Sequence, residues 1–301
     1  MTPLDYVDRP SGERRAEQVH AHRFLRWLYN TRSGRLATAL LVSSPLFSRL
    51  YGWLQRCRWS RRRVRPFVER MGVDLTGSVK RLDEFESFAD FFTRRLHASA
   101  RPIDADERVC VCPADGKVLV FPRVDRREWF RIKRATFQLG GLLRDDTLAT
   151  LFAGGSMAVV RLGLADYHHV HFPDSGVPSP ARAIAGAYHA GGPYALRRLV
   201  PFYTENHRMV TPFVSDRFGP MAIVEVGALT VGSIRQAYRP GVRVGRGERK
   251  AGFEPGGSTV VLLFRPGAIE LDPDLVAWSL EEVEVRVRMG ESLGRTCEGR
   301  V

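Results

Sequence analysis

Two patterns of apolar and polar residues divide the chain. Between residues 17 and 70, leucine, tryptophan and phenylalanine recur at roughly helical spacing among arginines. This spacing predicts amphipathic helices. From Val109 onward, short β-branched and apolar runs alternate with glycine and proline clusters, a pattern typical of a β-rich domain. The predicted strands cover residues 117–121, 157–162, 168–172, 207–212, 221–226, 230–236, 259–264 and 282–288.

A single predicted helix, residues 136–151, interrupts the series of strands. The expected fold class is therefore α+β, with a basic helical region at 1–84 followed by a β-rich domain at 85–301. The 301 residues suffice for one large domain or two small ones. With 44% hydrophobic and 26% charged residues, the composition is that of an ordinary globular protein.

The charge of the chain is unusual and unevenly distributed. The net charge is +13, and residues 1–65 hold 14 Arg against 4 Asp or Glu, a net of +10. Such a field attracts anionic surfaces, either nucleic acid or acidic lipid. The chain carries no recognition-helix signature, ribonucleoprotein motif or zinc knuckle, so a nucleic-acid partner is not expected. The longest uncharged N-terminal stretch, residues 36–48, is too short to span a bilayer.

The densest part of this basic region is the arginine run at residues 56–65, which has Trp53 and Trp59 beside it. Two interpretations stay open. The run is either the solvated face of a helical cap, or an interfacial anchor in which tryptophan enters the headgroup region while arginine binds anionic lipid. The N-terminus has no apolar core of a secretory signal. The four cysteines, which have neither zinc-finger spacing nor the density of a disulfide framework, are expected to be reduced thiols in a cytosol-facing protein: Cys57, Cys110, Cys112 and Cys297.

The candidate chemistry centres on Gly256-Gly257-Ser258-Thr259, which precedes the apolar run at 260–264. Glycine can hold strained backbone angles, so the Ser258 hydroxyl could approach the Gly257 carbonyl. Attack would give an ester, and elimination from that ester would leave dehydroalanine at residue 258. Hydrolysis of the dehydroalanine would release ammonia and leave an N-terminal pyruvoyl group. Taken alone, this tetrapeptide is more typical of an ordinary turn before a strand.

Other segments change that balance. They are Phe-Phe-Thr-Arg-Arg-Leu at 91–96, Ala-Arg-Pro-Ile-Asp at 100–104, Cys-Pro-Ala-Asp-Gly-Lys-Val at 112–118 and Asp-Tyr-His-His-Val-His-Phe-Pro at 166–173. In this order, together with Gly-Gly-Ser-Thr, they resemble the phosphatidylserine decarboxylase family. The resemblance continues through residues 218–220, 226–228 and 231–234, and it ends at 287–291. It covers roughly residue 85 to the C-terminus.

The resemblance implies self-cleavage between Gly257 and Ser258 by the logic of a serine-protease triad. It makes Ser258 the nucleophile, His171 the base and Asp115 the carboxylate that orients the imidazole. The products would be a large chain, residues 1–257, and a small chain, residues 258–301, that begins with the pyruvoyl cofactor derived from Ser258. This cofactor would form a Schiff base with the amine of phosphatidylserine and accept the electrons left when carbon dioxide departs. The product would be phosphatidylethanolamine.

The resemblance also makes His168 the proton donor that completes the decarboxylation. On a strand, His168 and His171 are an odd number of residues apart and would face opposite ways. Both reach one site only if the backbone turns or bulges there. A metal site made of His168, His169 and His171, with or without Asp166, is the alternative. This set matches no standard zinc spacing, so no metal is expected.

The expected partners follow from the same resemblance. They are phosphatidylserine, an anionic membrane surface and a second copy of the cleaved pair in a homodimer. The protein would then be peripheral to the cell membrane on its cytoplasmic side. The stretch 178–203 diverges from the family, which leaves a related serine-headgroup lipid open as the substrate. A non-cleaving lipid-binding homologue is the remaining alternative, although all three triad positions are present.

Overall fold

The structure is a computed structural model of the chain. It describes residues 5–17, 31, 33–34, 45–125, 130–132, 135–187, 189, 202–228, 234–256 and 258–297. Gly257, one side of the predicted cleavage site, lies outside the described residues, as do 188 and 190–201 of the divergent stretch.

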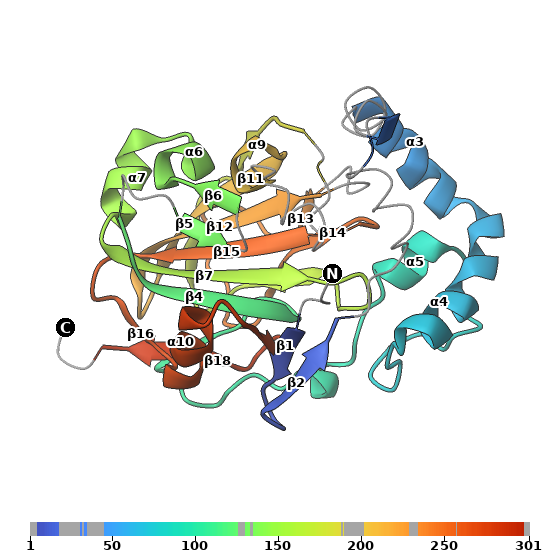
Figure 1. Ribbon diagram of the computed structural model, residues 1–301, viewed down its shortest axis with the longest axis horizontal. Helices are drawn as coiled ribbons and strands as arrows, with labels where there is room; N and C mark the ends of the chain where they lie inside the picture. The colour runs from blue at the N-terminus through green and yellow to red at the C-terminus, as the bar shows by residue number, and fades with distance from the viewer. Residues whose placement is uncertain are drawn as a thin grey trace.

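A ten-stranded sheet forms the centre of the molecule (Figure 1). Its strand order is β10-β11-β12-β15-β7-β4-β17-β1-β2, and β9 pairs with β11 off this path. The central strand β15 is antiparallel to both of its neighbours, β12 and β7. The ten strands are β1 (Asp5–Asp8), β2 (Glu13–Ala16), β4 (Gly116–Val124), β7 (Gly155–Leu162), β9 (Gly176–Pro178), β10 (Arg182–Ile184), β11 (Arg208–Ser215), β12 (Gly219–Gly227), β15 (Ser258–Phe264) and β17 (Glu284–Val287).

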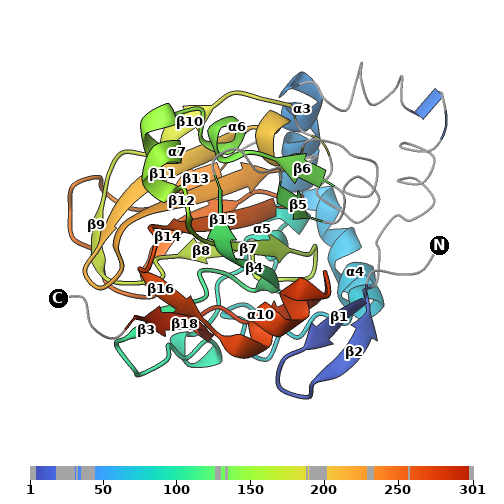
Figure 2. The ribbon, with the colours of Figure 1, turned by 60° about the vertical axis from the view of Figure 1, so that its left-hand side comes forward.

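Three smaller sheets accompany the main sheet, in the orders β13-β14-β8, β16-β18-β3 and β5-β6. Figure 2 shows the β16-β18-β3 sheet and α10 along one side of the molecule, with the β1–β2 hairpin beyond α10. The strands of the smaller sheets are β3 (Val109–Val111), β5 (Phe130–Ile132), β6 (Ala135–Phe137), β8 (His169–His171), β13 (Ile234–Gln236), β14 (Arg249–Phe253), β16 (Ile269–Leu271) and β18 (Ser292–Thr296).

Helices lie at opposite ends of the main sheet, with α3, α4 and α5 at one end and α6 and α7 at the other (Figure 1). Within the described ranges, no helix has the length and apolar content needed to cross a bilayer. The helices are α3 (Pro45–Arg56), α4 (Val64–Met71), α5 (Phe88–Phe92), α6 (Leu139–Leu143), α7 (Asp146–Phe152), α9 (Phe202–Glu205) and α10 (Pro273–Leu280), with 3-10 helices at Arg58–Arg63 and Ala98–Ala100.

The alternation of β15 builds a core on each face of the main sheet. Val260 and Leu262 belong to a core shared with the β13-β14-β8 and β16-β18-β3 sheets, whereas Val261 and Leu263 belong to a core shared with α6, α7 and α9. Successive side chains of a strand point to opposite faces. Ser258 is in phase with Val260, so it faces the first core and the sheet that contains β8.

Two predictions of local structure are wrong. The stretch 136–151 is not one helix, because Arg144 adopts a left-handed conformation (φ 44°) and the Asp145 side chain caps a second helix through Leu148 N. The N-terminal region is not helical throughout, because β1 and β2 extend the main sheet there. Each of these strands has four residues, too few for a periodic signal, and β1 pairs with a strand near the C-terminus.

Candidate active site

Ser258 is the first residue of the central strand β15, and its neighbours hold it on both sides. In the ladder it pairs with Gly227 of β12 and with Leu162 of β7, and it is 1% exposed. Two residues before it, Gly256 has φ 153°, a conformation that only glycine adopts without a steric penalty. The sequence therefore places a conformationally permissive turn directly before a rigidly paired serine.

His168 is the side chain that contacts this serine. Its Nδ1 lies 3.4 Å from Ser258 Oγ, and its ring stacks on Phe92 of α5 at 3.9 Å between centroids. The residue is fully buried, and Phe253 N donates to its carbonyl at 3.0 Å. Burial lowers the pKa of His168 to about 3, although the nearby Asp166 charge opposes that shift. A neutral imidazole beside a hydroxyl is able to accept its proton.

His171 lies on the other side of the strand. Its Nδ1 is 2.8 Å from the carbonyl oxygen of Gly247, which can only accept, so Nδ1 carries the hydrogen and Nε2 presents a lone pair. This Nε2 is buried and has no hydrogen-bond partner among the described residues. Burial lowers the pKa of His171, and the Asp115 charge opposes that shift. The ring lies 5.8 Å from that of Tyr167, which is on the same face.

His168 and His171 contact different groups, as alternation along a strand predicts. His169 is on the face of His171, where its Nε2 lies 3.2 Å from the carbonyl oxygen of Thr93. The three imidazoles thus have separate partners. His168 contacts Ser258, His169 contacts the carbonyl oxygen of Thr93, and His171 contacts that of Gly247. In the described part of the chain, no group of three or more His, Cys, Asp or Glu side chains is arranged to hold a metal ion.

Asp115 lies in the turn before β4, and Arg101 binds it. The Arg101 Nε donates to Asp115 Oδ1 at 2.8 Å, its Nη2 also donates to Oδ2, and Met289 N donates to Oδ1 at 2.9 Å. Asp115 is near enough to raise the pKa of both Tyr167 and His171 by its charge. Among the described residues, however, no hydrogen bond joins Asp115 to His171. Arg101 stands in the Ala-Arg-Pro-Ile-Asp segment, but its bond to Asp115 cannot be predicted from that segment.

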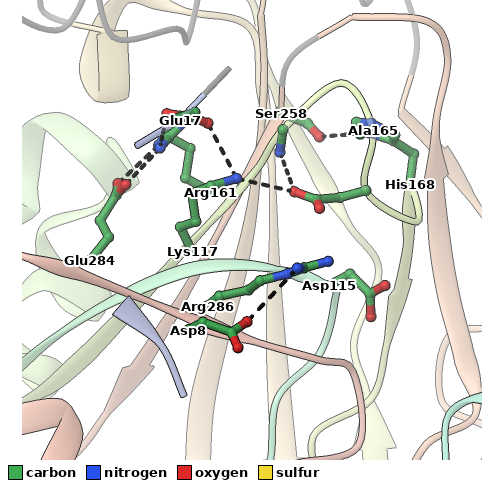
Figure 3. A network of polar contacts seen from close by, with 12 residues as sticks. Asp8, Glu17, Asp115, Lys117, Arg161, Ala165, His168, Ser258, Glu284 and Arg286 are labelled. Carbon is green, nitrogen blue, oxygen red and sulfur yellow. Dashed lines mark hydrogen bonds and ion pairs between the residues drawn. The ribbon is translucent and has the colours of Figure 1, made fainter. Parts of the chain in front are cut away.

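A second group of charges lies beside Ser258 (Figure 3). Arg161, which pairs in register with Thr259, donates to Glu284 at 2.6 Å and to Glu17 at 2.8 Å. Lys117 contacts Glu17 at 3.2 Å and Asp166 at 3.7 Å.

The loop that leads to His168 is held from two sides. Asp166 accepts from Gly163 N at 2.6 Å, and Arg94 donates to the carbonyl oxygen of Ala165 at 2.8 Å. Arg94 is 5% exposed and lies over the ring of Phe91. The Phe-Phe-Thr-Arg segment therefore positions His168 by two contacts, the Phe92 stack and the Arg94 bonds.

The residues around Ser258 also fit a carbonyl group formed from that serine. The site is closed to solvent, and the neutral His168 lies at hydrogen-bonding distance from the position of the Ser258 side chain. The His168 imidazole could therefore bond to the oxygen of a pyruvoyl group at this position.

The fold and this site define a protein with a buried serine beside a histidine at the start of its central strand. A family model described as phosphatidylserine decarboxylase matches residues 88–295. Curated relatives named phosphatidylserine decarboxylase proenzyme align over nearly the whole chain. The relative from Chlamydia felis is 41% identical over 98% of this chain and 99% of its own length, and that from Chlamydia trachomatis serovar L2 is 43% identical over 96% of each. The chain belongs to the phosphatidylserine decarboxylase family.

Proposed function

We propose that this chain is a phosphatidylserine decarboxylase proenzyme, a carboxy-lyase precursor that cleaves itself between Gly257 and Ser258. The observation that carries the proposal is the contact between Ser258 Oγ, at the start of the central strand β15, and the neutral His168. It occurs in a chain that belongs to this family. The pyruvoyl group derived from Ser258 supplies a carbonyl that binds the substrate amine and accepts electrons during loss of carbon dioxide. Phosphatidylserine is the substrate and phosphatidylethanolamine the product.

Intact-mass and denaturing-gel analysis tests the cleavage. The wild-type protein should give two chains, the smaller one starting with a blocked residue 258, and Ser258→Ala should give one. Ser156→Ala is the matched control, since Ser156 is a buried serine of the neighbouring strand β7 that bonds to Pro122 O at 2.8 Å. A wild-type chain that stays whole in the presence of anionic lipid refutes the proposal and favours the non-cleaving homologue. Carbon dioxide release from phosphatidylserine, and from other serine-headgroup lipids, then tests the substrate.

Variants of His168 and His171 distinguish the roles of the two histidines in self-cleavage. The family resemblance assigns the base of self-cleavage to His171 and the later proton donor to His168, with Asp115 orienting the base. The geometry supports His168 as the proton acceptor, because its Nδ1 is the imidazole nitrogen beside Ser258 Oγ. If so, His168→Gln blocks cleavage and His171→Gln leaves a measurable cleavage rate. The reverse pattern assigns the base to His171.

The N-terminal helices are proposed to dock on an anionic membrane surface at the cytoplasmic side. Leu50 and Trp53 of α3 and the nearby Trp59 are 54%, 57% and 53% exposed. Arg56 of α3 donates to Glu254 at 2.8 Å, four residues before Ser258, so the helix lies against the loop that carries the cleavage site. A lipid surface bound by α3 would therefore be near the reactive serine. The cleaved pair is further proposed to form a homodimer, which sedimentation equilibrium would test.

Vesicle co-sedimentation tests the docking. Binding should require acidic lipid and weaken with salt, because the arginine charges are screened. Replacing Trp53 and Trp59 by Ser should reduce binding to the same vesicles without changing cleavage of the chain. Equal binding to neutral vesicles, or no effect of the tryptophan changes, would contradict the proposed orientation.

A further inference from the structure

We infer that residues 5–17 form a clasp that holds the small chain, residues 258–301, on the large chain after self-cleavage. This inference rests on the proposed cleavage at Gly257–Ser258. The clasp consists of β1, the turn after it, β2 and Glu17. Its partner is the acidic face of the small chain around β17 and α10.

Backbone pairing is the first part of the clasp. β1 runs parallel to β17, with Tyr6, Val7 and Asp8 opposite Glu284, Val285 and Arg286. The other neighbour of β17 is β4, which pairs with only three of its residues. Without β1, the short β17 would become the edge of the main sheet and expose unpaired N–H and C=O groups. The clasp therefore covers an edge that belongs to the small chain.

Arg9 is the second part. It binds three separate points of the small chain: Asp274 at 2.7 Å, Asp272 at 2.8 Å and the carbonyl oxygen of Ser292 at 2.5 Å. The Arg9 side chain is 20% exposed, so water competes weakly for these bonds. They attach Arg9 to the start of α10 and to β18, which are themselves joined by the bond from Asp272 N to Leu293 O at 3.0 Å.

Further contacts add to the clasp, among them the ion pair between Asp8 and Arg286 of β17 at 3.9 Å. Arg14 donates to Glu281 at 2.7 Å and its guanidinium lies over the ring of Trp278. At the other end, Glu17 binds Arg161 of the large chain at 2.8 Å, and Arg161 binds Glu284 of the small chain at 2.6 Å (Figure 3). Glu17 thus closes a buried carboxylate–guanidinium–carboxylate triad that spans both chains.

These contacts matter most once the peptide bond is broken. In the intact chain, the covalent link keeps the small segment at a high effective concentration, so a lost contact is readily re-formed. After cleavage, the clasp opposes dissociation together with the ladders of β15, β17 and β18, the shared apolar cores and loop contacts such as the bond from Met289 N to Asp115. Each charge-assisted bond removed from a partly buried site should speed release about tenfold or more.

The test uses the cleaved protein with an affinity tag at the end of the small chain. The immobilised complex is washed in urea below the unfolding midpoint, and the large chain released is measured over time. Arg9→Ala and Glu17→Gln should release the large chain about tenfold faster than wild type. The matched control is Arg15→Ala, because Arg15 of β2 is 47% exposed and, among the described residues, its ion pairs are with Asp8 and Glu13 of the clasp itself. It should release at the wild-type rate.

Two comparisons make the result decisive. The same variants in a Ser258→Ala background report the effect on the uncleaved fold. The inference is overturned if a variant lowers the free energy of unfolding of the uncleaved chain by as much as its faster release corresponds to. It is also overturned if Arg9→Ala and Arg15→Ala release the large chain at equal rates. A wild-type chain that stays whole refutes the proposed function instead. In that event, a protease site can replace Gly257 and the chain can be cut in vitro. The urea wash of that cleaved protein then tests the clasp.

Discussion

Arginine serves two different purposes in two regions of this molecule. At the sheet end that holds Ser258, Arg161 and Arg101 are largely buried, and each is bonded to carboxylates. In the run after α3, Arg58, Arg62 and Arg65 are exposed, and in the part of the chain that the structure describes they have no carboxylate partner. A paired buried charge fixes the geometry of its neighbours, whereas an unpaired exposed charge remains available to an anionic surface. The composition of the chain could not separate the two.

The largest expected effect comes from breaking the buried charge group. Arg161→Met should leave Glu17 and Glu284 buried without their cation and reduce the free energy of unfolding by roughly 3–5 kcal/mol. Urea unfolding of the Ser258→Ala background measures this without interference from cleavage. Arg62→Met, the same change in the exposed run, should stay within about 0.5 kcal/mol of its parent. Equal losses would remove the distinction between the two regions.

The next effect is a dependence of stability on pH that originates at the buried end. In the unfolded chain His168 binds a proton near its ordinary pKa of about 6.5, whereas in the folded chain the pKa is about 3. Between these values the unfolded state holds more protons, so the free energy of unfolding falls as the pH is lowered, by about 1.4 kcal/mol per pH unit. Unfolding curves recorded across this range measure the slope. His168→Gln should flatten it, and an unchanged slope would assign the effect to other groups.

A smaller effect is expected at the pair formed by Arg101 and Asp115. Arg101→Lys keeps the charge but loses the two-pronged bond, because an ammonium cannot match the fork of a guanidinium. We expect a loss of roughly 1–2 kcal/mol in unfolding free energy together with slower self-cleavage. The rate of cleavage is measured by the appearance of the small chain on gels. Arg108→Lys is the control, since that residue bonds the exposed Asp106. Unchanged cleavage in Arg101→Lys would show that Asp115 needs no such support.

The smallest effect belongs to the exposed run. Changing Arg58, Arg62 or Arg65 singly to Gln should weaken binding to acidic vesicles by about 1 kcal/mol each and leave both unfolding and cleavage unaltered. Vesicle titration at low and at physiological salt measures the change. Arg123→Gln is a control outside the run, at an exposed position of β4. A similar loss of binding in that control would mean that overall charge, and not this surface, is responsible.

The strands of the central domain could be predicted because they are buried on both faces. The predictions at 259–264 and 221–226 fall within the observed β15 and β12, where continuous apolar runs leave little ambiguity. The short strands β1 and β14 carry no such run, and their positions depend on partners distant in sequence. The helical prediction at 17–70 agrees, from residue 45 onward, with α3 and α4.

The site shows the same limit. Simple alternation along a strand separated His168 from His171, and it requires no knowledge of the fold. Neither the stack of His168 on Phe92 nor the bond from Arg101 to Asp115 follows from spacing, because each joins elements that meet only in three dimensions. Only the folded chain identifies the imidazole nearest to Ser258. The roles of Asp115, His168 and His171 stay predictions that the variants above address.

The pairing of Ser258 on both edges of β15 has a further consequence. A new chain end is ordinarily the most mobile part of a protein. Here, an end created at residue 258 would begin inside a ladder bonded to β12 on one side and β7 on the other. A carbonyl attached to it would be mounted on the sheet as firmly as an interior side chain. The loss of translational and rotational freedom that slows a reaction between two molecules would then fall on the incoming amine alone.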